Sequence, residues 1–112
     1  MRVLFCGGRK YRDRARVKEV FDKLEITIGA HGAAPGADTL CGMEMTFRGI
    51  AQVVFPANWK GDGHYEAGPI RNQRMLDEFR PDVLVAFPGK TGTADMVARA
   101  KAAGVQVRRV KP

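Results

Sequence analysis

The stretch Phe87–Thr93 ("FPGKTGT") contains residue types that bind phosphate, and it directly follows an apolar run. Its Gly-Lys-Thr segment also ends the phosphate loop of ATPases and GTPases, which has a first glycine five positions before the glycine of that segment. In this chain that position is Leu84, inside the apolar run. No residues remain to wrap around a phosphate, so the sequence excludes this type of loop.

We expect a simpler arrangement, in which Gly89 and Gly92 let the chain turn tightly from a strand into a helix. The first turn of that helix would present N–H groups and the positive end of its dipole to an anion. An ordinary strand-to-helix turn with a solvated lysine is the alternative. The predicted phosphate-binding residues of this stretch are Pro88, Gly89, Lys90, Thr91, Gly92 and Thr93.

Two earlier stretches have similar glycines. "GGRKY" allows close approach of the backbone to a ligand, although it lacks the three spaced glycines of the dinucleotide fingerprint. In "HGAAPGAD", two glycines border a turn, and a helix starting near Ala37 would face an anion. Asp38 is equally well explained as a helix cap, and Tyr11 as a residue that only closes its loop. The predicted ligand-binding residues here are Gly7, Gly8, Arg9, Tyr11, Gly32, Gly36, Ala37 and Asp38.

Four further side chains are candidates for chemistry. Arg71, beside Asn72 in the first turn of a predicted helix, could hold a phosphate bidentately or form a surface ion pair. Trp59 lies in a long loop and could stack on a base, or cover the core or a subunit interface. His64, in the same loop, could act as an acid or base or be solvated. We therefore add Arg71, Asn72 and Trp59 to the predicted site.

The elements that must position these residues follow from the apolar patterns. Runs of apolar residues predict strands at 3–6, 25–30, 50–56, 82–88 and 105–110, the last near an edge of the sheet. Helical spacing predicts helices between them, the first capped by Asp13. In the second helix, Leu40, Met43 and Phe47 form the expected core stripe, and Met45 is expected at the surface or an interface. Gly49 and Gly104 are expected to end the second and fourth helices, and Pro69 to begin the third.

Strands that alternate with helices predict an α/β domain with a mostly parallel five-stranded sheet and helices on both faces. Its 112 residues suggest one domain, 1–112. No apolar run approaches the roughly 20 residues that span a bilayer, and the first residues indicate a strand, not a signal peptide. Cys6 and Cys41 fit a reducing cytoplasm, Cys6 as a small buried residue, and no spacing indicates a metal site. The formal charge of +7 favours an anionic partner, either a phosphorylated metabolite or nucleic acid.

Four segments, "GGRKYRD", "HGAAPGADTL", "FPANWKGDGHYEAGPIRNQRML" and "PDVLVAFPGKTGTADMVARAKAAGV", together resemble the YspA-like family of the SLOG superfamily. These are small Rossmann-like, three-layer domains of bacteria and phages, often described as domains of unknown function. The resemblance covers nearly the whole chain, with the motifs in the same order. The superfamily includes Lonely Guy phosphoribohydrolases, the Rossmann part of the DNA-processing protein DprA and sensors of nucleotide-derived signals. The resemblance thus implies a nucleotide-derived ligand.

Lonely Guy enzymes carry Pro-Gly-Gly-x-Gly-Thr-x-x-Glu and an arginine followed four residues later by methionine. Arg71 with Met75 resembles the second motif, and the residues from Pro88 to Thr93 resemble the first, with Lys90 at the second glycine. The glutamate, whose carboxylate would assist glycosidic cleavage, is replaced by Met96. Asp95 stands one residue early, a rotation of about 100° on a helix. Arg71 and Asp95 are the catalytic candidates, with Asp38 and Glu66 as other carboxylates.

We therefore expect a protein that binds a nucleotide or nucleotide-derived molecule as a sensor or by sequestering it. Hydrolysis of the N-glycosidic bond of a nucleoside 5′-monophosphate is the alternative, and nucleic-acid binding is the second alternative. We expect no cofactor, no metal and no membrane partner. The superfamily commonly assembles, which implies a homodimer or higher homo-oligomer.

Overall fold

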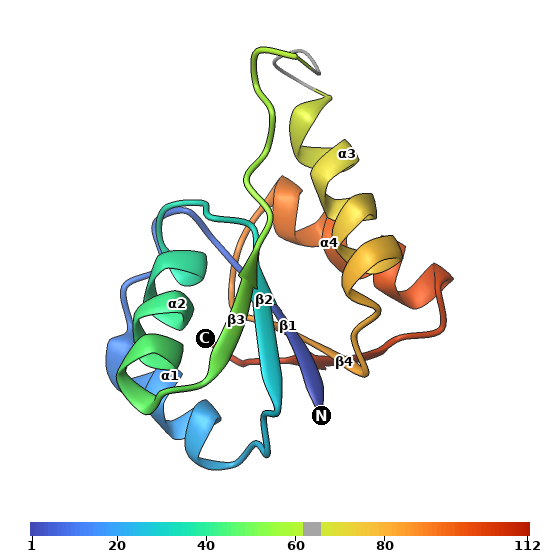
Figure 1. The fold of residues 1–112 in the computed structure, drawn as a ribbon. Helices are drawn as coiled ribbons and strands as arrows, with labels where there is room; N and C mark the ends of the chain where they lie inside the picture. The colour runs from blue at the N-terminus through green and yellow to red at the C-terminus, as the bar shows by residue number, and fades with distance from the viewer. Residues whose placement is uncertain (62–65) are drawn as a thin grey trace.

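Strands and helices alternate along the chain in a computed structural model that describes residues 1–61 and 66–112 (Figure 1). The strands are β1 (Arg2–Cys6), β2 (Ile28–His31), β3 (Ala51–Val54), β4 (Val83–Ala86) and β5 (Gln106–Arg109). The helices are α1 (Arg14–Asp22), α2 (Ala37–Arg48), α3 (Ala67–Arg74) and α4 (Thr91–Ala102), and α3 continues into a π-helical turn, η1 (Met75–Phe79).

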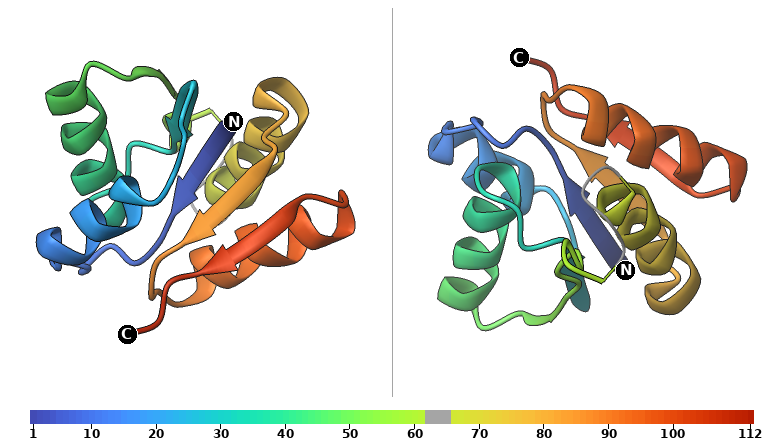
Figure 2. Two further views of the ribbon diagram at one scale, coloured as in Figure 1. Left: turned by 90° about the horizontal axis from the view of Figure 1, so that it is seen from below. Right: turned by 90° about the horizontal axis from the view of Figure 1, so that it is seen from above.

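The five strands form one parallel sheet in the order β3-β2-β1-β4-β5. The register aligns Leu4 of β1 with Ala30 of β2 and with Leu84 of β4. Helices α1 and α2 cover one face, and α3, η1 and α4 cover the other (Figure 2). The predicted three-layer α/β architecture is confirmed, and β5 lies at an edge as expected.

Both faces of the sheet are buried because successive strand residues point to opposite sides. In β1, Val3 and Phe5 pack under α1 and α2, while Leu4 and Cys6 pack under η1 and α4. Cys6 is buried, as predicted. The apolar runs of β1 and β4 were readable from the sequence because these central strands expose almost nothing.

Local end signals in the sequence are also confirmed. The carboxylate of Asp13 accepts a hydrogen bond of 3.0 Å from the Arg16 N–H at the start of α1. Gly49 ends α2 in the left-handed conformation with φ 69°, and Gly104 follows α4 with φ 76°. The start of β2 was predicted too early: the strand begins at Ile28, because the residues before it bind the chain's first residue, with Thr27 N–H donating to the Met1 carbonyl at 2.9 Å.

The predicted core stripe of α2 is wrong at two of its three residues, Met43 and Phe47, whereas Leu40 is partly buried against the core. Phe47 is 80% exposed and Met43 is 45% exposed, while Met45 is completely buried with Ala37 and Cys41. These buried residues follow the spacing i, i+4, i+8, so the helix is rotated from the expected orientation. Its rotation is set by close packing at small residues: the Met45 sulfur occupies the place where a side chain at Gly29 would begin.

Candidate functional site

The loops that follow β1, β2 and β4 meet at the carboxyl edge of the sheet. From β1 the chain crosses to β2 on one side, while β4 lies on the other side, so this edge has a topological switch point, where open α/β sheets bind ligands. Gly8 connects the loops: its N–H donates to the Pro88 carbonyl at 2.9 Å, and its carbonyl accepts from the Ala37 N–H at 3.0 Å.

Glycine is required at several of these contacts. A Cβ at Gly8 would lie 2.8 Å from the Pro88 carbonyl oxygen, and one at Gly7 would lie 2.6 Å from the Cβ of Ala37. Gly36 has φ 82° and would place a Cβ on the Gly8 carbonyl oxygen. The structure therefore brings six of the predicted residues into one contact region: Gly7, Gly8, Gly36, Ala37, Pro88 and Gly89.

The start of α4 borders this region. Lys90 is the residue before the helix, and the Ala94 N–H donates to its carbonyl at 2.9 Å. Within the described residues, the N–H groups of Thr91, Gly92 and Thr93 have no backbone acceptor. This helix end therefore has three donors available, together with the positive end of the helix dipole.

Thr93 adds a hydroxyl at the same place. The residue is 8% exposed, and its hydroxyl makes no hydrogen bond to any residue that the structure describes. The hydroxyl oxygen itself is not fully buried, because the one buried side-chain polar atom without a partner among the described residues is Glu44 Oε1. Its oxygen is directed at Gly89, where it occupies the place of a missing side chain. A hydroxyl that the described residues leave without a partner, beside vacant N–H donors, is a suitable contact for a phosphate oxygen.

Helix α3 holds the start of α4 in place through Asn72, which is 5% exposed. Its side-chain amide donates to the Gly92 carbonyl at 3.3 Å and to the Asp95 carboxylate at 2.9 Å. Asp95 also forms an ion pair with Arg99 at 2.9 Å. Both predicted site residues, Asn72 and Asp95, are thus engaged in fixing the two helices against each other.

Arg71 lies in the second turn of α3, not the first as expected, and reaches the ends of β2 and β3. Its Nη1 donates to the carbonyls of Gly32 and Phe55, and its Nε donates to Asn72. Among the described residues, its Nη2 has no hydrogen-bond partner. Partial burial lowers the pKa of Arg71, opposed by the nearby Asp38 carboxylate, but arginine stays charged. One arm of its guanidinium is therefore available for an anion.

The β2–α2 loop holds a strained residue, Ala33, with φ 61°. Its N–H donates to His31 Nδ1 at 3.0 Å, and the Asp38 carboxylate accepts from the N–H groups of Gly32 and Ala34 at 3.1 Å each. Asp38 therefore fixes this loop, while Gly36 stands at the cap position of α2. The buried side chains of His31 and Asp38 thus fix the conformation of this loop through hydrogen bonds to its backbone.

Burial changes the pKa values of the groups around this loop. It lowers the pKa of His31, although the neighbouring Asp38 carboxylate has the opposite effect. It raises the pKa of Asp38, although the two N–H groups that donate to its carboxylate and the nearby Arg71 act to lower this pKa. Burial also raises the pKa of Cys6, which keeps this residue a neutral thiol. Sequence reasoning missed His31; its place directly after a predicted strand and before Gly32 was the available signal.

The remaining predicted residues lie around the edge. Tyr11 packs its ring on Phe87 with centroids 5.2 Å apart, and burial raises the pKa of its hydroxyl. Arg9 and Lys90 are exposed. Trp59 is 44% exposed and lies beside Gly68 at the start of α3. His64 lies outside the described residues.

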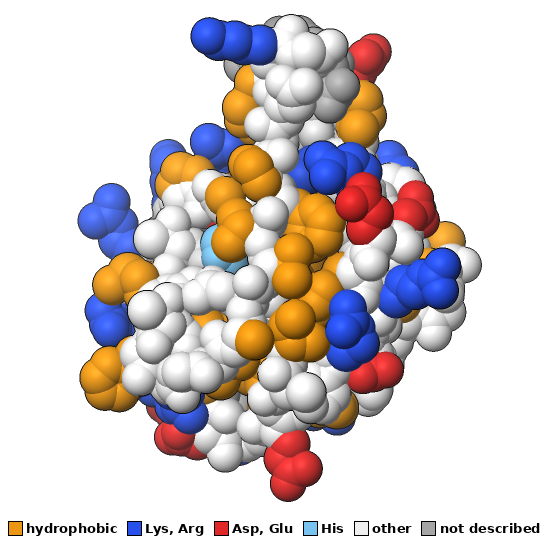
Figure 3. Space-filling view, in the orientation of Figure 1, with side chains coloured by type: hydrophobic (Ala, Val, Ile, Leu, Met, Phe, Trp, Pro, Cys, Tyr) orange, Lys and Arg blue, Asp and Glu red, His pale blue; other side chains and the backbone are white. Residues whose placement is uncertain are grey.

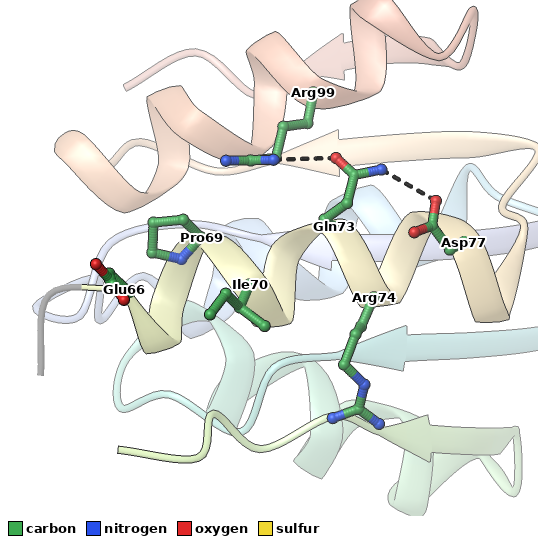
Figure 4. Close-up of a pocket in the computed structure, with 7 residues that line it drawn as sticks. All are labelled: Glu66, Pro69, Ile70, Gln73, Arg74, Asp77 and Arg99. Atoms are coloured by element: carbon green, nitrogen blue, oxygen red, sulfur yellow. Dashed lines mark hydrogen bonds between the residues drawn. The ribbon is translucent and has the colours of Figure 1, made fainter. Parts of the chain in front are cut away.

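A cavity of about 560 Å³ lies elsewhere, on the outer side of α3 beside α4 (Figure 4). Its polar groups bind one another: Arg99 donates to Gln73 at 3.0 Å, and Gln73 donates to Asp77 at 3.0 Å. A second cavity of about 650 Å³ lies against α2. The second cavity borders the candidate site, because His31 and Ala33 of the β2–α2 loop line it. We place the candidate site at the carboxyl edge, where the vacant N–H groups at the start of α4 and the glycine contacts meet.

In the ranges 1–61 and 66–112, no three His, Cys, Asp or Glu side chains are grouped so that they could hold a metal ion. The same part of the chain contains no helix long and apolar enough to cross a membrane.

The sheet order and the glycine-lined carboxyl edge define a Rossmann-like α/β domain. A family model described as "YspA, cpYpsA-related SLOG family" matches residues 1–61, and the chain belongs to this family. Among solved structures, the chain is similar to UDP-GlcNAc 2-epimerase from Neisseria meningitidis, determined bound to UDP-GlcNAc, with a TM-score of 0.57 and 16% identity. The match covers 98% of this chain and 32% of the epimerase, and it supports the fold alone. A comparison with curated proteins found no match.

Proposed function

We propose that this protein binds a nucleotide or nucleotide-derived small molecule, with a phosphate at the start of α4. The observation that carries the proposal is the hydroxyl of Thr93, a residue that is 8% exposed. The hydroxyl lacks a partner among the described residues and lies beside the N–H groups of Thr91 and Gly92, which have no backbone acceptor there. The glycines at 7, 8, 36 and 89 allow the backbone of three loops to approach a ligand. Membership of the SLOG family and the nucleotide sugar bound by the similar epimerase agree with such a ligand.

Arg71 supports a second contact to the same ligand. Its charge is partly compensated by Asp38, and exposed Arg9 is near enough to oppose its protonation. Two arginines close enough to affect each other would orient a phosphorylated molecule at the carboxyl edge. Stacking of Trp59 on a base is a prediction from its position in the long loop before α3.

We favour a sensor or a sequestering protein over an enzyme. At the glutamate position of the Lonely Guy motif, Met96 is 1% exposed and packs in the core between α4 and the sheet. The neighbouring carboxylate, Asp95, accepts hydrogen bonds from Asn72 and Arg99. Neither residue supports general acid or base catalysis on a bound ribose. The two buried free thiols, Cys6 and Cys41, agree with a reducing cytoplasm.

Calorimetric titration with nucleoside monophosphates, ADP-ribose and cyclic nucleotides tests the proposal. We expect at least one of them to bind, and Thr93→Val to weaken that binding by about fivefold to tenfold, the loss of roughly one hydrogen bond. Thr46→Val is the control for loss of a threonine hydroxyl, because Thr46 is an exposed residue of α2 outside the predicted site. The absence of binding by every ligand at millimolar concentration would refute the proposal. Release of free base on long incubation would instead support the hydrolase.

We also propose that the chain forms a homo-oligomer through α2 and the edge strand β3. Phe47, Met43 and Val54 are 80%, 45% and 44% exposed, and hydrophobic side chains gather over β3 and beside α2 (Figure 3). An edge strand also presents unpaired backbone groups that a second copy can pair with. Light scattering coupled to size exclusion should show a dimer or larger species that Phe47→Glu dissociates. A monomeric wild type at high concentration would exclude this assembly.

A further inference from the structure

Three segments at the carboxyl edge carry the net charge of the whole chain. They are residues 7–14 after β1, residues 87–92 after β4, and residues 108–112 at the end of β5. Their side chains contribute eight positive charges and one negative charge, that of Asp13, which leaves +7, equal to the formal charge of the complete sequence. All other charges therefore cancel. The cations are Arg9, Lys10, Arg12, Arg14, Lys90, Arg108, Arg109 and Lys111.

These eight side chains are not neutralised by the protein itself. All of them are exposed, and in the part of the chain that the structure describes none forms an ion pair. The ion pairs of that part involve arginines at 16, 48, 74 and 99. The carboxylate of Asp13 accepts from the Arg16 N–H and caps α1. Exposed cations elsewhere, such as Lys18, Lys23 and Lys101, form no ion pair in the described part either, so what distinguishes this edge is its excess of cations over carboxylates.

The three segments are neighbours in space. Gly8 N–H donates to Pro88 at 2.9 Å, and Val110 N–H donates to Ala86 at 2.8 Å, so the end of β4 connects the other two. Viewed onto the carboxyl edge, the β1–α1 loop, the start of α4 and the C-terminal residues lie on the same side (Figure 2, right). Strands lie about 4.8 Å apart, so the strand ends from β1 to β5 span roughly 10 Å before the side chains add their length. This row of cations is wider than one phosphate.

We propose that this basic edge binds the sugar–phosphate backbone of a nucleic-acid strand. A row of exposed cations without their own counter-charges matches a row of phosphates and releases the counterions bound to them. A membrane surface is a poorer match, because none of the large hydrophobic side chains exposed in the described part belongs to these segments. Contacts to phosphates alone predict binding without sequence preference. Arg9 and Lys90 also belong to the predicted nucleotide site, but the other six cations lie outside it, so the inference can be tested separately.

Fluorescence anisotropy with a labelled single-stranded oligonucleotide, titrated from 50 to 300 mM salt, tests the proposal. A triple variant, Lys10→Gln, Arg12→Gln and Arg14→Gln, removes three edge cations outside the predicted nucleotide site. The matched control, Lys18→Gln, Lys23→Gln and Lys101→Gln, removes three exposed cations elsewhere. We expect the edge variant to bind about tenfold more weakly at low salt. The slope of log affinity against log salt should become shallower by about 2, because each of the three lost phosphate contacts accounts for roughly 0.7. The control should change affinity by less than about twofold.

Equal weakening in both triple variants would overturn the proposal, because binding would then follow total charge and not this edge. No binding by the wild type at low salt would also overturn it. If ATP displaced the labelled strand as well as the unlabelled strand does at equal phosphate concentration, the edge would be a site for small polyphosphates and the proposal would be wrong. Thermal unfolding of both triple variants shows whether they are folded. Since the tested cations are not predicted nucleotide contacts, failure here would leave the nucleotide titrations unaffected.

Discussion

The side chain of Thr93 illustrates what a single residue contributes to the candidate site. Threonine is an ordinary residue in the first turn of a helix, and the sequence alone allowed either a phosphate contact or a simple turn. The structure adds that the residue is nearly buried and directed at Gly89. The burial of Thr93 and the direction of its side chain depend on the packing of α3 against α4, and a local sequence motif does not determine that packing.

Ala33 is a residue with a measurable strain. Its φ of 61° lies in the left-handed region, which costs a non-glycine residue roughly 1–2 kcal/mol. We expect Ala33→Gly to stabilise the protein by about 0.5–1 kcal/mol, since relief of strain exceeds the added entropy of the unfolded chain. Chemical denaturation measures this change. Ala34→Gly is the control, because Ala34 is not in the left-handed region and should lose stability. Equal destabilisation in both variants would show that Ala33 is not strained.

At the scale of the element, the β2–α2 loop links pH to stability. Burial lowers the pKa of His31 below its ordinary value of 6.5, so the unfolded chain takes up this proton first as the pH falls. The stability that His31 contributes is complete above this value and is lost below it. Burial raises the pKa of Asp38 above 3.8, which has the opposite sign: protonation of Asp38 on acidification favours the folded state.

His31→Asn tests this loop, because the asparagine side-chain oxygen can accept from the Ala33 N–H without titrating. We expect the melting temperature of the wild type to fall by about 2–5 °C more than that of the variant between pH 7.5 and pH 5.5. Melting curves of both proteins at the two pH values provide the comparison. Identical shifts in the two proteins would show that His31 does not control the loop.

Helix α2 shows why some elements were predicted and their orientation was not. Its start, length and Gly49 end follow from local signals, and these agree with the structure. Its buried face is not the face with the most hydrophobic residues. The missing side chain of Gly29 makes room for Met45, and Gly36 packs closely against the backbone of Gly8. Such contacts join residues from different elements, so the apolar spacing within α2 misplaced Met43, Met45 and Phe47.

At the scale of the whole molecule, the parallel order of the sheet explains most of what sequence reasoning could reach. Short apolar runs alternating with helical patterns predict a parallel sheet, and a parallel sheet places all its carboxyl ends on one edge. The convergence of the glycine loops was therefore predictable before their contacts were known. The positions of side chains within that edge, such as Arg71 in the second turn of α3 and His31 beside Ala33, depend on tertiary packing.

The charge distribution of the molecule has the same origin. The net charge of +7 is visible in the composition, but its location needs the fold, which brings residues 7–14, 87–92 and 108–112 to one edge. An edge with vacant helix donors and unneutralised cations attracts anions at long range and holds them at short range. Both the nucleotide proposal and the nucleic-acid inference follow from this one feature and share Arg9 and Lys90, whereas the other six edge cations lie outside the predicted nucleotide site.

The start of α4 can be tested directly by a change of charge at Gly92, where an added side chain would meet no atom within 4 Å. Gly92→Asp places a carboxylate in the first turn, which favours the helix but repels a bound phosphate. Gly92→Asn is the neutral control of the same shape. For the tightest ligand of the nucleotide panel, calorimetry should show at least about tenfold weaker binding to Gly92→Asp than to Gly92→Asn, a difference of about 1.4 kcal/mol. Equal binding to the two variants would contradict a phosphate site at this helix end.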